Sequence, residues 1–154
     1  MTVEIGAPAP AFDLEDASGS PVTLSSFAGR KLVLYFYPKD DTSGCTREAK
    51  DFTSLKEAFA AAETEIVGVS PDAPKSKAKF ARKHDLSITL AADEDKSAAE
   101  AYGVWVEKSM WGRRYMGVER STFLIDRDGR VARIWPKVSV AGHAEEVLEA
   151  ARTL

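Results

Sequence analysis

The sequence predicts an α/β fold with a mixed central sheet flanked by helices. Two short, largely apolar runs, Leu32–Tyr37 and Glu65–Ser70, resemble strands buried on both faces of a sheet. Amphipathic helical patterns follow both runs, as expected for parallel crossovers. Late in the chain, residues 122–125 and 131–135 flank a glycine-containing turn, which indicates an antiparallel hairpin. Crossovers followed by a hairpin predict a sheet with both pairing directions.

Residues 1–30 form an N-terminal extension to this unit. Phe12 and Leu14, then Val22 and Leu24, alternate around a turn rich in serine, glycine and proline, which predicts a small β-hairpin. Residues 25–29 predict a single helical turn that ends at a glycine.

Length and charge limit the classes of function. The 154 residues predict one domain spanning 1–154, and a net charge of -3 gives no basic surface for nucleic acid. No apolar run approaches the roughly 20 residues that cross a bilayer, and residues 1–6 lack the pattern of a signal peptide. The single cysteine cannot form an internal disulfide. We therefore expect a cytoplasmic protein without a membrane partner.

The fold is organised around the junction that follows the first apolar run. Pro38 ends this strand, and a polar turn leads to a helical pattern whose apolar face is Ala49, Phe52, Leu55, Phe59 and Ala62. Thr42 or Ser43 is the predicted N-cap. Cys45 then lies in the first helical turn, where free N–H groups favour the thiolate. The alternative is that Cys45 is an ordinary small buried residue.

The middle of the chain contains two further predicted helices. One begins with Pro74, is capped by Asp72 or Ser70, and ends near His84. We expect its basic side chains to form a solvated face: Lys77, Lys79, Arg82 and Lys83, together with Ser76. The second begins at a capping box, residues 97–100, and ends at Gly103. Between them, residues 86–90 alternate like a short strand.

The remaining polar clusters predict structure rather than chemistry. The acidic residues 93–95 lack the spacing of a calcium loop, so we expect no metal there. We expect residues 104–117 to form a loop that packs Trp105 and Trp111 against the domain. His84 is expected at a surface helix end, and His143 at the start of the last helix, neither with a catalytic role.

Two segments resemble a known family. The motif Pro38-x-x-x-Thr42-x-x-Cys45 resembles the active-site signature of the peroxiredoxins, and residues 36–48 are similar to the branch called bacterioferritin comigratory protein or peroxiredoxin Q. Residues 115–126 are similar to the segment that carries the active-site arginine of this branch. The resemblance runs from about Gly6 to the last helix. It implies a thioredoxin fold, no cofactor and a thiol peroxidase that reduces hydrogen peroxide and organic hydroperoxides.

The resemblance also implies roles for individual residues. Cys45 would attack the peroxide and become a sulfenic acid, and Arg120 would stabilise the charge on sulfur and oxygen. Thr42 would bridge sulfur and peroxide with its hydroxyl, while Pro38 would shield the sulfur from water.

Two further residues are expected to bind substrate or support the site. The backbone at Gly44 would donate to the peroxide, because glycine permits close approach. Glu48 carries a charge that opposes thiolate formation, so we expect it to orient Arg120 or another basic group.

The chain departs from many members of this branch at one position. They carry a second cysteine five residues after the first, and this chain has Lys50 there. The sulfenic acid must then be reduced by an external thiol: thioredoxin, glutaredoxin, a small-molecule thiol or a second copy of the chain. The branch implies a monomer.

Two other functions stay open at this point. A thioredoxin-like disulfide reductase would need a Cys-x-x-Cys motif and a proline before the strand after the active site, and the chain has neither. A redox sensor that binds a partner after oxidation shares its first step with a peroxidase, so the residues alone do not separate the two.

Overall fold

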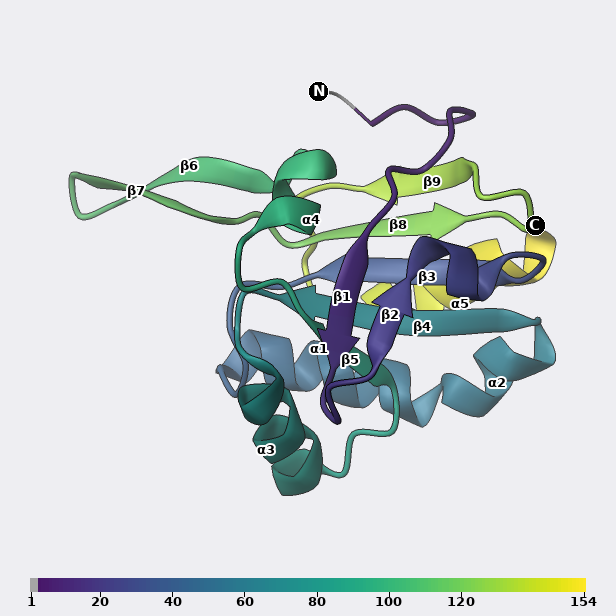
Figure 1. Ribbon diagram of the computed structural model, residues 1–154, viewed down its shortest axis with the longest axis horizontal. Helices are drawn as coiled ribbons and strands as arrows, with labels where there is room; N and C mark the ends of the chain where they lie inside the picture. The colour runs from purple at the N-terminus through teal and green to yellow at the C-terminus, as the bar shows by residue number, and fades with distance from the viewer. Residues whose placement is uncertain (1–2) are drawn as a thin grey trace.

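Strand β3 lies near the middle of a seven-stranded sheet with the order β2-β1-β5-β4-β3-β8-β9 (Figure 1). A computed structural model describes residues 3–154; Met1 and Thr2, the start of the segment that lacks a signal-peptide pattern, lie outside them. The strands of this sheet are β1 Asp13–Asp16, β2 Pro21–Thr23, β3 Lys31–Phe36, β4 Thr64–Ser70, β5 Thr89–Ala92, β8 Ser121–Ile125 and β9 Val131–Trp135.

The pairing directions confirm the predicted mixed sheet. β3 pairs with β4 in parallel and with β8 antiparallel, while β4 and β5 are parallel. The late hairpin is β8–β9, and the N-terminal hairpin β1–β2 joins the sheet because β1 pairs with β5. The crossover helices and the hairpins therefore account for both directions, as in a thioredoxin-like fold.

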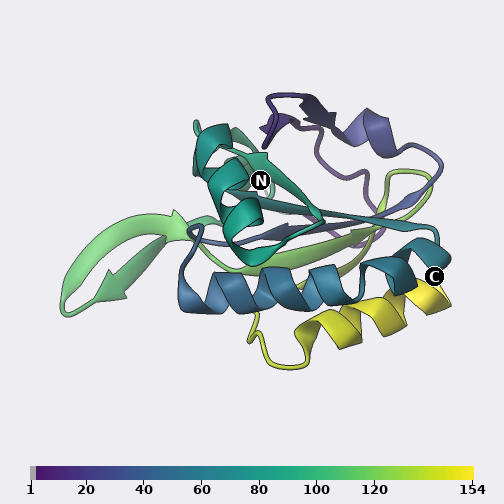
Figure 2. The ribbon, with the colours of Figure 1, turned by 90° about the horizontal axis from the view of Figure 1, so that it is seen from below.

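The helices cover the sheet in layers. They are α1 Ser43–Ser54, α2 Lys56–Ala61, α3 Pro74–His84, α4 Ser97–Ala101 and α5 His143–Thr153, with a 3₁₀ turn at Leu24–Phe27. Figure 2 shows α1 and α2 end to end beneath one face of the sheet, with α5 beside them. The predicted helical turn near residue 25 is thus confirmed, whereas the single helix predicted after Cys45 is interrupted at Leu55, between α1 and α2.

Strand β3 is buried on both faces, as its sequence predicts. Leu32, Leu34 and Phe36 enter one apolar cluster with β1, β2 and α4 residues. The alternate positions, among them Val33 and Tyr35, enter a second cluster with α1, α3 and α5. Burial on both faces explains why the sequence of β3 is a nearly continuous apolar run without alternation.

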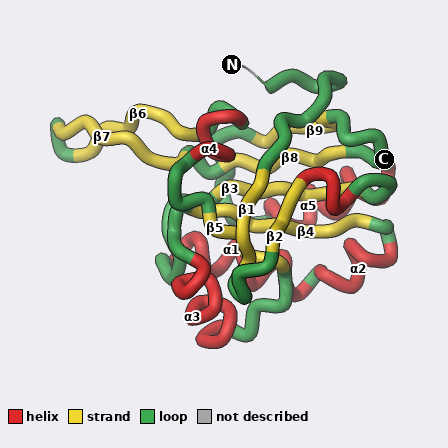
Figure 3. The backbone as a smooth tube through the Cα atoms, viewed as in Figure 1, coloured by secondary structure: helices red, strands yellow, loops and turns green. Residues whose placement is uncertain are grey.

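The predicted loop at residues 104–117 is wrong. This segment forms a two-stranded hairpin, β6 Trp105–Met110 and β7 Arg113–Val118, that extends away from the sheet (Figures 1 and 3). Its turn is Trp111-Gly112, both at positive φ, which matches the twist of a hairpin. Trp105 packs partly against the core, but Trp111 is 93% exposed. β6 and β7 form a separate two-stranded sheet, so strand pairing and not contact with the domain holds the tip.

Several expected caps are also wrong. At α4 the N-cap is Lys96, not the Ser97 side chain, and the carboxylate of Asp93 accepts from the N–H groups of Ala98 and Ala99. At α3 the N-cap is Ala73 without a side-chain bond, although Pro74 does occupy the first turn. At α4 the carboxylate before the helix thus takes the role that the sequence spacing assigns to Ser97, whereas no side chain caps α3.

Strand β5 begins at Thr89, later than the predicted strand at residues 86–90. The two earlier apolar residues, Leu86 and Ile88, are instead buried beside α3 and α1 in the second cluster. Among residues 3–154, no helix has both the length and the apolar character needed to cross a membrane.

Candidate active site

The end of β3 delivers Cys45 into the first turn of α1. The N–H of Tyr37 makes a last sheet bond to the carbonyl of Val69, at 2.9 Å, and Pro38 then begins the polar turn. Thr42 is the N-cap, so Cys45 is the third helical residue. N–H groups in this first turn have no partner within the helix. The thiol is 2% exposed and packs in the second apolar cluster.

Arg120 reaches the sulfur from a distant part of the sequence. Its Nη2 lies 3.3 Å from Cys45 Sγ, within hydrogen-bonding distance for a sulfur acceptor. The sheet explains this proximity: Ser121 pairs with Phe36 in the antiparallel β3–β8 register, so the residue before β8 lies where β3 ends. A guanidinium is always charged and offers several donors in a fixed plane.

Glu48 holds the other side of the same guanidinium. Arg120 Nη1 donates to Glu48 Oε1 at 2.6 Å, and Glu48 is 1% exposed. Burial raises the pKa of Glu48 to about 7, while the positive charge of Arg120 opposes that rise. The expectation that Glu48 orients Arg120 agrees with this contact. Its second oxygen, Oε2, has no hydrogen-bond partner among the described residues.

Gly44 leaves room for Arg120 beside the helix. A Cβ atom at this position would lie 3.2 Å from Arg120 Nη2, closer than ordinary van der Waals contact. The residue has no positive φ, so space rather than backbone conformation explains the glycine. A larger residue would displace the guanidinium or the first turn of α1.

Thr42 lies at the predicted position but makes a different bond. It is the N-cap by backbone geometry, yet its hydroxyl donates to the carbonyl of Lys39 at 2.9 Å and caps no helical N–H. The predicted hydroxyl cap is therefore wrong, because the hydroxyl is directed to the preceding turn and accepts from no N–H group of α1. Pro38 is half-buried between β3 and this turn.

Lys77 corrects the prediction of a solvated basic face on α3. Its side chain is fully buried, and Nζ donates to Tyr37 Oη at 2.8 Å, to Asp40 Oδ1 at 3.0 Å and to Ser70 Oγ. Burial lowers the pKa of Lys77 while Asp40 raises it. The signal was its spacing: Lys77 lies three residues before Phe80 and therefore shares the apolar face of α3.

The two histidines lie outside the Cys45–Arg120 contact. His84 Nε2 bonds to the exposed carboxylate of Asp41 at 2.7 Å, at the end of α3. His143 begins α5, is buried, and bonds to Thr122 Oγ1 at 2.8 Å. Burial lowers the pKa of His143 to about 4, so its imidazole is neutral at pH 7.

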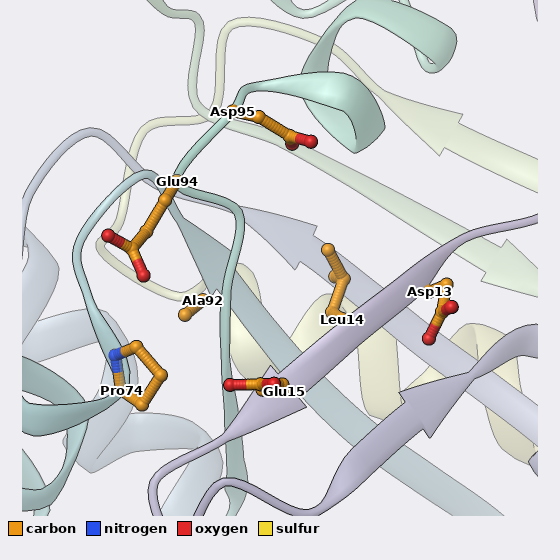
Figure 4. Close-up of a pocket in the computed structure, with 7 residues that line it drawn as sticks. All are labelled: Asp13, Leu14, Glu15, Pro74, Ala92, Glu94 and Asp95. Atoms are coloured by element: carbon orange, nitrogen blue, oxygen red, sulfur yellow. The ribbon is translucent and has the colours of Figure 1, made fainter.

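A hollow of about 370 Å³ lies elsewhere, between β1, the start of α3 and the loop after β5. Figure 4 shows its acidic lining, which includes Asp13, Glu15, Glu94 and Asp95. None of the residues around Cys45 lines it. Within residues 3–154, no group of three His, Cys, Asp or Glu side chains is arranged to hold a metal ion.

This geometry defines a class of protein: a thioredoxin-like fold that holds one thiol at a helix N-terminus against an arginine. Comparison with known families agrees with that class. The profile of the AhpC/TSA family matches residues 5–134, and the chain belongs to this family, among the Bcp or peroxiredoxin Q proteins. The match covers more than four-fifths of the sequence and includes every element from β1 to β8.

Individual relatives are similar over nearly their whole length. Peroxiredoxin Bcp of Bacillus subtilis is 48% identical over 97% of this chain and 95% of its own. Peroxiredoxin Bcp of Xanthomonas campestris is 46% identical over 93% and 91%. These identities support the interpretation of the two motif segments as parts of one family pattern.

Solved structures give the same result for the fold. The bacterioferritin comigratory protein of Xanthomonas campestris, studied for its alkyl peroxide reduction activity, aligns with a TM-score of 0.91 at 42% identity, covering 98% of this chain and 96% of that one. A mutant of PrxQ from Xylella fastidiosa aligns with a TM-score of 0.93 at 36% identity, over the same shares. The predicted thioredoxin fold is confirmed.

Proposed function

We propose that this peroxiredoxin reduces hydrogen peroxide and organic hydroperoxides through a sulfenic acid on Cys45, which an external thiol then reduces. The observation that carries the proposal is the 3.3 Å contact between Arg120 Nη2 and Cys45 Sγ. The alkyl peroxide reduction activity named for the Xanthomonas campestris relative supports the substrate class.

The first step is an attack of the Cys45 thiolate on one peroxide oxygen. The S–O bond forms as the O–O bond breaks, and the departing oxygen takes a proton to become water or an alcohol. Negative charge moves from sulfur to that oxygen. Arg120 lies beside the sulfur and would stabilise the charge throughout, with no rearrangement at the moment of reaction.

The other site residues would place the substrate. Free N–H groups near Gly44 would donate to the peroxide, and the Thr42 hydroxyl would do so after leaving the carbonyl of Lys39. Pro38 would keep water from the sulfur, since its ring adds apolar surface without an N–H donor. Glu48 would fix the guanidinium of Arg120 in the plane that faces Cys45.

The second step needs a partner outside the chain. Cys45 is the only cysteine in the sequence, so no internal disulfide can form. We propose thioredoxin, glutaredoxin or a small-molecule thiol as the reductant. Because a reducing compartment supplies such thiols, we propose that the protein is cytoplasmic. We also propose that it is a monomer of one domain.

A steady-state peroxidase assay with hydrogen peroxide and dithiothreitol tests the proposal. We expect Cys45→Ser to abolish turnover and Arg120→Ala to reduce kcat/KM for peroxide by about 100-fold or more, because each removes a group at the reacting atoms. Peroxidase activity retained by Cys45→Ser would refute the proposal. Oxidation of the wild type without turnover would instead favour the redox sensor.

A further inference from the structure

A buried polar cluster lies beside the turn that leads to Cys45 but has no part in the proposed chemistry. We call it the Lys77 cluster; its members are Lys77, Asp40, Tyr37, Ser70 and Ser76. The Lys77 side chain has no exposed surface, and that of Asp40 is 4% exposed. A buried charge is tolerated when it is paired and hydrogen-bonded, and three acceptors surround Nζ of Lys77.

Asp40 connects this cluster to the active-site turn. One carboxylate oxygen, Oδ1, faces Lys77 Nζ at 3.0 Å and accepts from Tyr37 Oη at 2.5 Å. The other, Oδ2, accepts from Ser76 Oγ of α3 at 2.7 Å. Its backbone N–H donates to the carboxylate of Asp72 at 2.8 Å. Asp40 therefore joins the turn to α3 and to the segment after β4.

The next residue extends this attachment. The carboxylate of Asp41 contacts Lys83 Nζ and His84 Nε2, both at 2.7 Å, near the end of α3. Two consecutive aspartates thus hold the turn against one helix. The pair at Asp41 is solvent-exposed and weakly stabilising, whereas loss of one partner in the buried Lys77–Asp40 pair would leave an uncompensated buried charge.

The position of the turn determines how accessible the sulfur is. The first helical bond of α1 runs from the N–H of Thr46 to the carbonyl of Thr42, at 2.8 Å, at the end of the turn. While this helical turn is formed, Cys45 is 2% exposed. A dithiol is much larger than hydrogen peroxide, so this burial hinders the approach of the dithiol to the sulfur more than that of the peroxide.

We propose that Lys77 is a positioning residue that, through Asp40, holds the 38–42 turn and keeps the first turn of α1 formed around Cys45. The cluster favours oxidation, which needs the ordered site, and slows reduction by an external thiol, which needs the opened one. This inference rests on the proposed function, because it assigns the two half-reactions of Cys45 to the two arrangements.

Both half-reactions balance with the thiol as reductant. In the formed site the thiolate gains one oxygen, the O–O bond breaks, and the remaining oxygen leaves as water or alcohol after taking a proton. In the opened site an external thiol attacks the sulfenic sulfur and water leaves. A second thiol then releases the Cys45 thiol and a disulfide.

Lys77→Met tests the proposal, with Lys79→Met as the matched control on an exposed position of α3. Stopped-flow mixing with hydrogen peroxide gives the oxidation rate constant, and mixing the sulfenic form with dithiothreitol gives the reduction rate constant. For Lys77→Met we expect oxidation to slow by about tenfold and reduction to accelerate by about tenfold, since displacement of a reacting group costs a factor of this order or more. Lys79→Met should match the wild type.

Amide hydrogen exchange provides a readout that does not depend on the chemistry. In Lys77→Met we expect the Thr46 amide to exchange at least about tenfold faster, while amides in the second half of α1 keep their protection. Ser76→Ala removes a single hydrogen bond from an uncharged donor to Asp40 and leaves the ion pair, so it should fold if Lys77→Met does not. It should shift both half-reactions in the same directions, by about threefold.

Three outcomes would overturn the proposal: unchanged half-reactions in Lys77→Met, a fall in both rate constants, or faster exchange spread evenly along α1. If Lys77→Met does not fold, unchanged half-reactions in Ser76→Ala would overturn it as well. A wild type that forms no sulfenic acid would overturn the proposed function instead. Exchange at Thr46 would still decide whether Lys77 holds the turn.

Discussion

Arg120 contacts two different groups through two different nitrogen atoms. Nη2 lies 3.3 Å from the Cys45 sulfur and Nη1 lies 2.6 Å from the Glu48 carboxylate. The rigid fork makes both contacts possible at once, because its donors are fixed in one plane. A lysine would bring the same charge as a single point and could not hold both partners in this geometry.

Arg120→Lys is therefore expected to behave as a damaging substitution. We expect kcat/KM for hydrogen peroxide to fall by about 100-fold, the effect typical of losing one preorganised donor. The control is Arg114→Lys on the exposed hairpin, where the arginine side chain is 82% exposed, and it should keep wild-type activity. Equal activity of Arg120→Lys and the wild type would show that charge alone is sufficient.

At the scale of elements, the packing of β3 against β4 depends on a missing side chain. Gly68 of β4 lies opposite Tyr35 in the parallel register. A Cβ atom at Gly68 would lie 2.6 Å from the Tyr35 ring, which is fully buried and stacks on Phe52 of α1 at 4.7 Å. The tyrosine therefore has no free space into which to move, and the same ring links β4 to the helix that carries Cys45.

Gly68→Ala is expected to lower the free energy of unfolding by about 1–3 kcal/mol, as overpacking of a core does. Urea denaturation measures this change. Gly117→Ala is the matched control on strand β7, because its nearest neighbour is the flexible side chain of Lys108 at 3.2 Å. The control should change stability by less than about 0.5 kcal/mol. Equal effects at both positions would contradict this packing argument.

For the whole molecule, two buried titratable groups oppose each other. The pKa of Glu48 is raised to about 7, so between pH 4.5 and 7 the folded state binds more protons than the unfolded state, and stability falls as pH rises. The pKa of His143 is lowered to about 4, so between pH 4 and 6.5 the unfolded state binds more protons, and stability rises with pH. Their contributions nearly cancel.

Removing either group should leave the pH dependence of the unfolding free energy that the other group causes. As pH rises from 4 to 6.5, the unfolding free energy of Glu48→Gln should increase by about 2 kcal/mol more than that of the wild type. As pH rises from 4.5 to 7, the unfolding free energy of His143→Gln should decrease by about 2 kcal/mol relative to that of the wild type. Urea denaturation across this pH range measures both profiles. All other titratable groups are the same in the wild type and the two variants, so their contributions cancel when the profiles are subtracted. Two variant profiles parallel to the wild type would contradict the opposed pKa shifts.

The sequence predicted the parts of the fold that depend on local pattern. The buried run around Leu34, the late hairpin and the helix after Cys45 were all predicted, because periodicity and turn residues directly report burial and direction. For the hairpin tip at Trp111 the sequence predicts a packed loop, since tryptophan in a core is the usual case and nothing local shows that the tip extends into solvent.

The site divides in the same way. The motif around Cys45 and the segment around Arg120 were located from the sequence, and the structure brings these two residues together. For Lys77 the sequence predicts exposure to solvent, because a lysine in a basic helix is normally exposed. Its burial depends on Asp40 and Ser70, whose proximity arises only from the tertiary fold. No local pattern contains that information.

The most direct measurement of the central claim is a single turnover of the reduced protein with equimolar hydrogen peroxide, followed by stopped flow and intact mass. We expect a rapid gain of one oxygen atom, located on Cys45, that dithiothreitol reverses, and a much slower gain in Arg120→Ala. An unchanged mass, or an oxygen gained at the same rate with and without Arg120, would contradict the account.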